Sequence, residues 1–273
     1  MKTREKTSEE LKETVKKKYA QISEQSRKDN ETSCCGAGGC DTVDYSVFAD
    51  DYSKMEGYNA DADLGLGCGL PTEYAHIQEG DTVIDLGSGA GNDCFVARQL
   101  TGETGRVIGL DMTEKMIDKA NKNVKKLGFE NVGFVLGDIE NIPLEDNFAN
   151  VVVSNCVLNL VPDKEQAFSE TYRIIKPGGH FSISDVVIKG NLPHSLKEDA
   201  EMYAGCVAGA IDLNEYLNVI KDAGFENVSI QKQKEISLPE EILKKYMTAE
   251  QIREFIESET GIFSITVYGK KPE

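Results

Sequence analysis

Apolar residues recur along this chain with two different periods, and each period predicts a different kind of element. Near the N-terminus an apolar side chain returns every three or four positions, at Leu11, Val15, Tyr19 and Ile22. This spacing places the four side chains on one face of an α-helix of about four turns. The segment TSEE at residues 7–10 has the sequence of a capping box, so the helix is expected to begin there.

From about residue 80, short apolar runs alternate with amphipathic stretches. The apolar runs predict strands at 82–87, 106–112, 132–138, 150–156 and 180–187. The stretches between them predict helices at 90–100, 113–127 and 163–176, and Pro-Gly-Gly at 177–179 predicts a turn. Strands that alternate with helices in this way are typical of a mostly parallel sheet with helices on both faces, which is an α/β fold.

The remaining C-terminal part is less regular. It predicts helices near 195–206 and within 214–225, a strand at 227–233, two short helices within 239–258 and a last strand at 263–271. Asn214 is the expected N-cap of the second of these helices and Gly224 its C-cap. We therefore divide the chain into an N-terminal extension (1–74), a core (75–190) and a C-terminal α+β segment (191–273) that is expected to cover the carboxyl-terminal edge of the sheet.

Charge and hydropathy exclude several classes of partner. The chain has 273 residues and a formal net charge of −17, so it repels phosphate backbones and anionic membranes, and nucleic acid is not an expected partner. No run of apolar residues is long enough to predict a membrane-spanning helix, and the N-terminus lacks the apolar region of a secretory signal. The seven cysteines are an odd number, which argues against a disulfide framework and for a reducing, cytoplasmic location.

A glycine-rich turn follows the first predicted core strand, in the sequence Asp85-Leu86-Gly87-Ser88-Gly89-Ala90-Gly91. Glycines allow a sharp turn and a close approach of a ligand to the backbone. The turn matches neither the dinucleotide fingerprint, because Asn92 occupies the third glycine position, nor the P-loop. The second strand ends in Asp111, which suits ribose hydroxyls, and the third ends in Asp138 and Ile139, which suit an adenine amine and ring.

These motifs together resemble the class I S-adenosylmethionine-dependent methyltransferases. The segments VIDLGSGAG, VIGLDMT, VLGDIENIP and YRIIKPGGHFSISD match successive motifs of that family in order and spacing. The resemblance implies a Rossmann-like fold with a seven-stranded type of sheet, and S-adenosylmethionine as the cofactor. It implies that the cofactor is bound by Asp85, Gly87, Ser88, Gly89, Gly91, Asp111, Met112, Asp138, Ile139 and Asn155. Tyr52 and Tyr58 are candidates to cover the methyl donor, although a structural role suits them equally.

Two of three cysteines, Cys68 and Cys156, occupy positions where a substrate would bind, and the third, Cys206, would have to reach them through the fold of the C-terminal segment. Cys68 stands among glycines in LGLGCGLP, Cys156 ends the fourth core strand, and Cys206 lies in the small-residue segment EMYAGCVAGA. Thiolates that converge favour a soft centre such as Zn(II), which usually takes four ligands, or trivalent arsenic, which takes three sulfurs. Arsenic keeps a lone pair that can accept a methyl group without a general base. Cys94, on the first core helix, is expected to be buried packing.

The cysteine-containing segments resemble the arsenite methyltransferases. That resemblance implies that Cys68, Cys156 and Cys206 hold As(III), and that a fourth, N-terminal cysteine pairs with the first of them in a redox-linked disulfide. Cys40 lies at a suitable separation, while Cys34 and Cys35 in the same SCCGAGGC loop remain alternatives. It further implies that arsenite arrives as a thiol adduct, that glutathione or thioredoxin serves as reductant, and that the protein is a monomer.

Two other functions remain open from the sequence. The chain could be a C- or O-methyltransferase of a small organic acceptor such as a quinone precursor. Such a reaction needs a general base, and no histidine or tyrosine stands in a suitable motif. It could also be a non-catalytic, thiol-based protein that binds a metalloid, but the intact glycine turn with Asp85 and Asp111 argues against a silent domain.

Overall fold

The computed structural model of the protein describes most of the chain but not all of it. The described residues are 7–25, 27, 50–190, 209–236, 243–244, 247–257 and 261–273. The predicted loop at 33–40 and the predicted helix near 195–206 lie outside them. Four of the cysteines discussed above therefore lie outside the described residues: Cys34, Cys35, Cys40 and Cys206.

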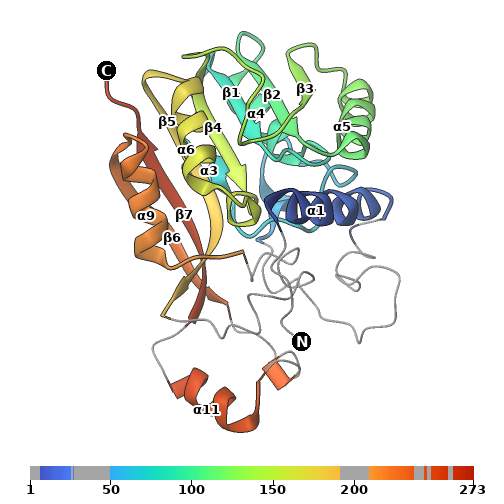
Figure 1. The fold of residues 1–273 in the computed structure, drawn as a ribbon. Helices are drawn as coiled ribbons and strands as arrows, with labels where there is room; N and C mark the ends of the chain where they lie inside the picture. Colours follow the sequence, from blue (N-terminus) through green and yellow to red (C-terminus); the bar gives the residue numbers. More distant parts are fainter. Residues whose placement is uncertain are drawn as a thin grey trace.

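The described chain is built on one sheet of seven strands, shown in Figure 1. Its strands are β1 (Thr82–Leu86), β2 (Arg106–Asp111), β3 (Val132–Leu136), β4 (Ala149–Asn155), β5 (Ile175–Lys189), β6 (Glu226–Ile236) and β7 (Gly261–Lys270). They lie in the order β3-β2-β1-β4-β5-β7-β6. The pairs from β3 to β5 are parallel, whereas β7 runs antiparallel to both β5 and β6. The predicted α/β fold with a mostly parallel sheet is confirmed.

The helices pack on both faces of this sheet because alternate strand residues point to opposite faces. Val83 and Val107 belong to an apolar cluster with Phe95 of α4 (Asn92–Thr101) and Met116 of α5 (Glu114–Leu127). Their neighbours Ile84 and Ile108 belong to the cluster on the other face. That cluster includes Phe168 of α6 (Lys164–Ile174) and Tyr216 of α9 (Leu213–Asp222).

The N-terminal helix α1 (Ser8–Ile22) begins as predicted. The Thr7 side chain accepts from the Glu10 amide and the Glu10 side chain accepts from the Thr7 amide, which completes the capping box. Buried Val15 and Ile22 lie on its inner face. In Figure 1, α1 lies across the end of the sheet toward which β4 points. The predicted helix therefore covers the carboxyl ends of the parallel strands.

Short elements complete the described fold. They are α3 (Pro71–Tyr74), α11 (Ala249–Glu257) and two 3₁₀ turns, η2 (Tyr52–Lys54) and η3 (Leu158–Leu160). No helix among the described residues is both long enough and apolar enough to cross a membrane.

The C-terminal segment extends the sheet, because β6 and β7 join it as its last two strands. Both predicted caps of α9, Asn214 and Gly224, need correction. Its N-cap is Asp212, whose side chain accepts from the amides of Asn214 and Glu215, so Asn214 already lies inside the helix. Gly224 follows the C-cap Ala223 with a φ of 105°, a conformation that favours glycine.

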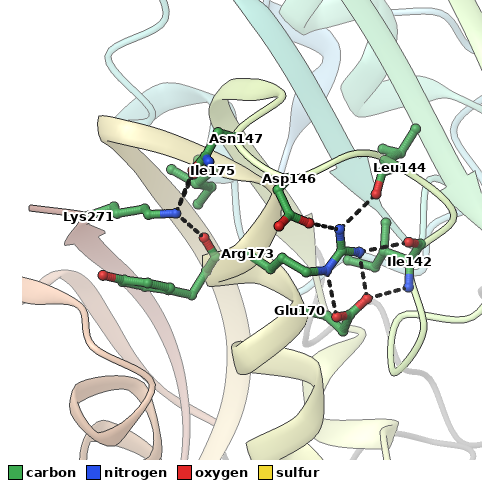
Figure 2. Close-up of polar contacts among 9 residues, drawn as sticks. Ile142, Leu144, Asp146, Asn147, Glu170, Arg173, Ile175 and Lys271 are labelled. Atoms are coloured by element: carbon green, nitrogen blue, oxygen red, sulfur yellow. Dashed lines mark hydrogen bonds and ion pairs between the residues drawn. The ribbon is translucent and has the colours of Figure 1, made fainter. Parts of the chain in front are cut away.

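The predicted turn at 177–179 is a bulge within β5. Ile175 pairs with Ala149 and His180 pairs with Val151, so the intervening residues of β5 have too few partners on β4. The chain after β7 fixes the bulge, since the Gly178 amide donates to the Lys271 carbonyl over 3.1 Å. The Lys271 ammonium donates to Asn147 Oδ1, Tyr172 O and Ile175 O at 2.8–2.9 Å (Figure 2).

A second polar contact anchors the connection between β3 and β4, which carries two predicted site residues. The Arg173 guanidinium of α6 forms ion pairs of 2.8 Å with Asp146 and Glu170 and donates to the carbonyls of Ile142 and Leu144 (Figure 2). Glu170 also accepts from the Ile142 amide. This connection is therefore held to α6 on one side while its first residues, Asp138 and Ile139, face the site.

Candidate functional site

The glycine turn after β1 forms the floor of a cavity at the carboxyl ends of the strands. Gly87, Gly89 and Gly91 all have positive φ angles, of 74°, 52° and 98°. A Cβ added to Gly89 would meet no atom within 4 Å, so this residue faces open space where a ligand can approach the backbone. A Cβ added to Gly91 would meet the rings of Phe95 and Phe134, so Gly91 serves packing of the turn.

Asp111, at the end of β2, is tied to this turn. Its carboxylate accepts from the Gly89 amide at 3.0 Å and from the Thr113 amide at 2.8 Å. Burial raises the pKa of Asp111, while these two backbone hydrogen bonds favour its charged form. A carboxylate held at the switch between strands, with further acceptor capacity, suits the ribose hydroxyls of a nucleotide-like ligand.

The cavity has a volume of about 150 Å³ and brings together most of the predicted cofactor-binding residues. Its lining includes Gly87, Ser88, Gly89, Asp111, Met112, Asp138, Ile139 and Asn155. Ser88 Oγ is buried and has no hydrogen-bond partner among the described residues. The hydroxyl lies against β2, because a Cβ added to Gly109 would be 2.6 Å from it. The open space over Gly89 and the further acceptor capacity of Asp111 fit an S-adenosylmethionine molecule.

Two predicted cofactor-binding residues do not line the cavity, namely Asp85 and Gly91. Asp85 is buried behind the turn, where its Oδ2 accepts from Cys94 Sγ at 3.3 Å. Burial and the nearby Asp93 raise the pKa of Asp85 well above its usual value. The structure thus places the Asp85 side chain against α4 and away from the cavity, and it confirms Cys94 as a buried packing residue.

Asp138 lines the cavity but is already engaged by α1. Its Oδ2 lies 2.7 Å from the Lys12 ammonium, which also pairs with Glu140. Lys12, Val15 and Tyr19 of α1 all contribute to the cavity lining. The sequence predicts α1 as a helix but carries no signal that it forms a wall of this site, because a docking position depends on contacts distant in sequence.

Cys68 and Cys156 lie next to this cavity, in one buried apolar cluster with Leu160, Val186 and Ile262. Cys68 is 1% exposed and Cys156 is 4% exposed. Cys156 follows β4 with a φ of 59°, its amide donates to the Ser184 carbonyl at 2.7 Å, and it contributes to the cavity lining. The structure therefore brings two of the three predicted thiols into the same part of the molecule.

The glycines around Cys68 allow its loop to lie flat on the strand ends. A Cβ on Gly67 would lie 2.6 Å from Asn155 Nδ2, and a Cβ on Gly69 would lie 2.6 Å from Ser184 Cβ. Asn155 also binds the loop directly, because its Oδ1 accepts from the Cys68 amide at 3.0 Å and its Nδ2 donates to the Gly69 carbonyl at 2.9 Å. The sequence predicts Asn155 as a site residue but does not predict this hold on the thiol loop.

Sequence reasoning missed Asp93, which faces the cavity from the first turn of α4. The Tyr52 hydroxyl lies 2.8 and 2.9 Å from its two oxygens, and Asn155 Nδ2 donates to it at 3.3 Å. Burial raises the pKa of Asp93 to about 6, although both hydrogen bonds favour the charged form. Tyr52 lines the cavity as one of the two candidate covers, whereas Tyr58 does not. The sequence signal that could have found Asp93 is an acid in the first turn of the helix that follows the glycine turn.

A further buried acid, Asp185, belongs to β5. Asp185 accepts from the Tyr216 hydroxyl at 2.9 Å, and burial raises its pKa to about 7. Lys164 donates to the carbonyls of Asn159 and Val161 at 2.9 and 3.0 Å, and burial lowers its pKa to about 8. The opposite charges of Asp185 and Lys164 partly offset these shifts. Among the described residues, no group of three or more His, Cys, Asp or Glu is arranged to hold a metal ion.

Comparison with known proteins gives a consistent family. Residues 77–243 match the family described as a methyltransferase domain. The arsenite methyltransferase of Halobacterium salinarum is 44% identical over 240 residues, which cover 83% of this chain and 60% of that protein. The human arsenite methyltransferase is 39% identical over 168 residues, which cover 58% of this chain and 44% of that protein.

A solved structure extends the comparison to three dimensions. The crystal structure of CrArsM, an arsenic(III) S-adenosylmethionine methyltransferase from Chlamydomonas reinhardtii, matches with a TM-score of 0.63 and 36% sequence identity. The match covers 76% of this chain and 68% of that one. The chain thus spans about two thirds of this solved relative, and between 44% and 60% of the two curated relatives.

Proposed function

Because the chain belongs to the arsenite S-adenosylmethionine methyltransferase family, we propose that it transfers a methyl group from S-adenosylmethionine to trivalent arsenic held by cysteine thiolates. The observation that carries this proposal is the position of Cys156. It lines the cavity above the glycine turn and shares a buried cluster with Cys68. A thiol pair beside a cofactor cavity is what a thiophilic acceptor requires.

The residues around the glycine turn form the donor site in this proposal. When bound, S-adenosylmethionine supplies an electrophilic methyl group on a positively charged sulfur. Asp111 accepts hydrogen bonds from ribose hydroxyls, Gly89 leaves room for the ligand, and Ile139 covers an apolar ring from the side of the β3 connection. Asp138 binds the adenine amine or remains paired with Lys12, and Asp85 and Gly91 act indirectly by shaping the turn.

The thiols form the acceptor site. Three sulfurs suit trivalent arsenic, and buried thiolates exclude water that would compete as ligand. We assign Cys68, Cys156 and Cys206 to this role. Cys206 lies outside the described residues, but Ala210, four residues later in the chain, is buried in the same cluster as the other two thiols. The arsenic lone pair is the nucleophile, so positioning is required and a general base is not.

The proposal also includes the source of the arsenic and the reductant of the cysteines. We assign arsenite delivery to a glutathione adduct, from which the protein thiols take over arsenic by thiol exchange. The incoming cysteine thiols give their protons to the leaving glutathione thiolates. Glutathione or thioredoxin then keeps Cys68 and the N-terminal cysteine, for which Cys40 is the first candidate, reduced in the cytoplasm. The protein acts as a monomer in this scheme.

The direct test is a methyl-transfer assay with labelled S-adenosylmethionine, arsenite and excess glutathione, in which the arsenic species are separated. We expect methylated arsenic from the wild-type protein and a fall of at least about a hundredfold for Cys156→Ser, because an arsenic ligand is lost. Cys94→Ser is the matched control, since Cys94 is equally buried but does not line the cavity.

The outcomes separate the candidate functions. Donor binding without methylated arsenic, together with methylation of an organic acceptor such as a quinone precursor, would overturn the proposed acceptor. Full methylation of arsenic by Cys156→Ser would overturn the thiol assignment. Arsenic binding with no methyl transfer under any condition would indicate a metalloid-binding protein.

A further inference from the structure

Asp93 is a carboxylate at the cavity whose charge has no cationic partner among the described residues. The cavity lining contains four aspartates: Asp63, Asp93, Asp111 and Asp138. Asp63 pairs with Arg27, Asp138 pairs with Lys12, and Asp111 accepts from two backbone amides. Asp93 instead accepts from the neutral Tyr52 hydroxyl and Asn155 amide. Asp93 and Asp111 are therefore the two lining aspartates that no cation pairs with among the described residues, and Asp93 is the one that Asn155 joins to the thiol loop.

The position of Asp93 identifies which part of the donor it faces. Asn155 Nδ2 donates to Asp93, and Asn155 Oδ1 accepts from the Cys68 amide at 3.0 Å. One side chain thus links the carboxylate to the thiol loop. The donor must present its methyl group toward the thiol-bound acceptor, and the positively charged sulfur carries that methyl group. Asp93 therefore lies at the end of the cavity where this charge must be placed.

We propose that Asp93 is the counter-ion of the donor's sulfonium, and that Tyr52 and Asn155 hold its carboxylate in position. The inference rests on the proposed function for the identity of the donor. Once the methyl group has been transferred, the sulfur is a neutral thioether and Asp93 has lost its partner. The site therefore discriminates between donor and spent product by one charge, which favours product release.

The titration of Asp93 supports this assignment. Its pKa is raised to about 6 by burial, while the titratable groups around it are Tyr52, Asp63, Asp85 and Cys94. Asp63 and Asp85 are themselves acids and Cys94 and Tyr52 are neutral at this pH, so none of these groups supplies a positive charge. A bound cation favours the ionised carboxylate, so donor binding near pH 6 releases a proton.

The experiment is calorimetric titration of the full chain with S-adenosylmethionine and, separately, with S-adenosylhomocysteine at pH 7. We expect Asp93→Asn to weaken donor binding by about tenfold or more and product binding by less than about threefold, because only the donor carries the sulfonium charge. Asp111→Asn is the matched control. It is expected to weaken both ligands by a similar factor, since both carry the same ribose.

A second variant keeps the test independent of Asp93→Asn. In the wild-type protein, donor affinity should fall by about tenfold from pH 7 to pH 5 as Asp93 is protonated. Tyr52→Phe removes a hydrogen bond that favours the charged form, so the midpoint of this pH dependence should move to higher pH. Asp93→Asn should make the dependence flatter and abolish the proton release at pH 6, which titrations in two buffers with different ionisation enthalpies measure.

The results distinguish this inference from the proposed function. Equal weakening of donor and product in Asp93→Asn, or an unchanged pH midpoint in Tyr52→Phe, would overturn the counter-ion role while donor binding stands. If the wild-type chain bound neither ligand, S-adenosylmethionine would not be its methyl donor, and the role inferred for Asp93 would be wrong as well. A tight, charge-selective donor site in a protein that methylates no arsenic would uphold Asp93 and overturn only the acceptor.

Discussion

The glycines on either side of Cys68 explain why this cysteine has no large apolar neighbours in the sequence. They allow the loop to approach Asn155 and Ser184 within distances that a methyl group would prevent. Ser264 Oγ adds a hydrogen bond to the Cys68 carbonyl from β7. The orientation of this thiol is therefore set by small residues and by backbone contacts, and we expect it to be sensitive to single added carbon atoms.

Gly69→Ala tests this sensitivity. The new Cβ would lie 2.6 Å from Ser184 Cβ, and Ser184 is buried in β5, so the loop must move away from the sheet. We expect arsenite affinity, measured by calorimetry in the presence of glutathione, to fall by about tenfold, and the free energy of unfolding to fall by about 1–3 kcal/mol.

Gly133→Ala is the control for this substitution, because an added Cβ there would meet no atom within 4 Å. It should leave arsenite affinity unchanged. Unchanged arsenite binding in Gly69→Ala would show that the loop does not position the thiol.

The site residues that could be predicted from the sequence lie at strand ends, whereas those that were missed depend on contacts between distant segments. Asp111 ends β2, Asn155 ends β4 and Cys156 follows it, and the carboxyl ends of these parallel strands lie at one edge of the sheet on either side of β1. The pattern of predicted strands was therefore sufficient to predict that these residues lie close together. Lys12 and Asp93 contribute through contacts to segments distant in sequence, and no local pattern encodes which charges will be paired. Asp85 follows the same strand-end rule but points to Cys94 instead.

At the scale of elements, α1 has a role that its amphipathic pattern does not reveal. Its apolar face was evident, and its capping box fixed its first residue. The pairing of Lys12 with Asp138 and Glu140 then joins the helix to the connection after β3, which Arg173 anchors from the other side. The cavity is thus closed by an element that is attached mainly through side chains.

Lys12→Ala should loosen this attachment. The Lys12 side chain is 21% exposed, so the loss of two ion pairs is expected to cost about 1 kcal/mol or somewhat more in docking α1. Hydrogen exchange in residues 8–22 should become several-fold faster, and donor affinity should fall by a similar factor.

Lys17→Ala provides the comparison, because within the described part of the chain Lys17 pairs only with Glu13 on the same helix, and both side chains are largely exposed. It should change neither quantity. Faster exchange in both variants would indicate a general loss of helicity and would contradict the role of Lys12.

Two elements show where local rules were sufficient and where they were not. The boundaries of β1 and α5 follow from apolar runs and helical periodicity. The Pro-Gly-Gly segment reads locally as a turn, but Gly178 and Lys271 bind each other across more than 90 residues of chain and make it part of β5. A bulge that depends on such a distant partner cannot be distinguished from a turn by composition.

At the scale of the whole molecule, several buried carboxylates have raised pKa values. Burial raises the pKa of Asp93 to about 6 and that of Asp185 to about 7, and it also raises that of Asp111. In the unfolded chain these groups titrate near 4, so between pH 4 and 7 the folded state binds more protons. Stability therefore falls as pH rises through this window.

We expect the free energy of unfolding, measured with urea, to be about 1–3 kcal/mol greater at pH 5.5 than at pH 7.5. His180 opposes part of this change, because burial lowers its pKa. Asp185→Asn should reduce the pH dependence, since the amide side chain that it introduces is neutral at both pH values. A free energy of unfolding that rises from pH 5.5 to pH 7.5 would contradict the raised pKa values.

The overall architecture was predictable because it depends on a repeated local pattern. Alternating strands and helices fix a parallel sheet, and the right-handed rule for crossovers limits the strand order. The place of the C-terminal segment was not predictable in the same way. Its two strands pair with β5 and with each other over long separations, and the boundary drawn at residue 190 runs through one continuous sheet.

The insertion of β7 between β5 and β6 also has a consequence for the order of events during synthesis. A ribosome produces β6 before β7, yet β6 contacts the sheet only through β7. Until residues 261–270 have left the exit tunnel, β6 has no neighbouring strand to join and the backbone edge of β5 remains open. During synthesis the edge of β5 is therefore exposed until β7 pairs with it, and an exposed strand edge is a site at which chains aggregate or chaperones bind.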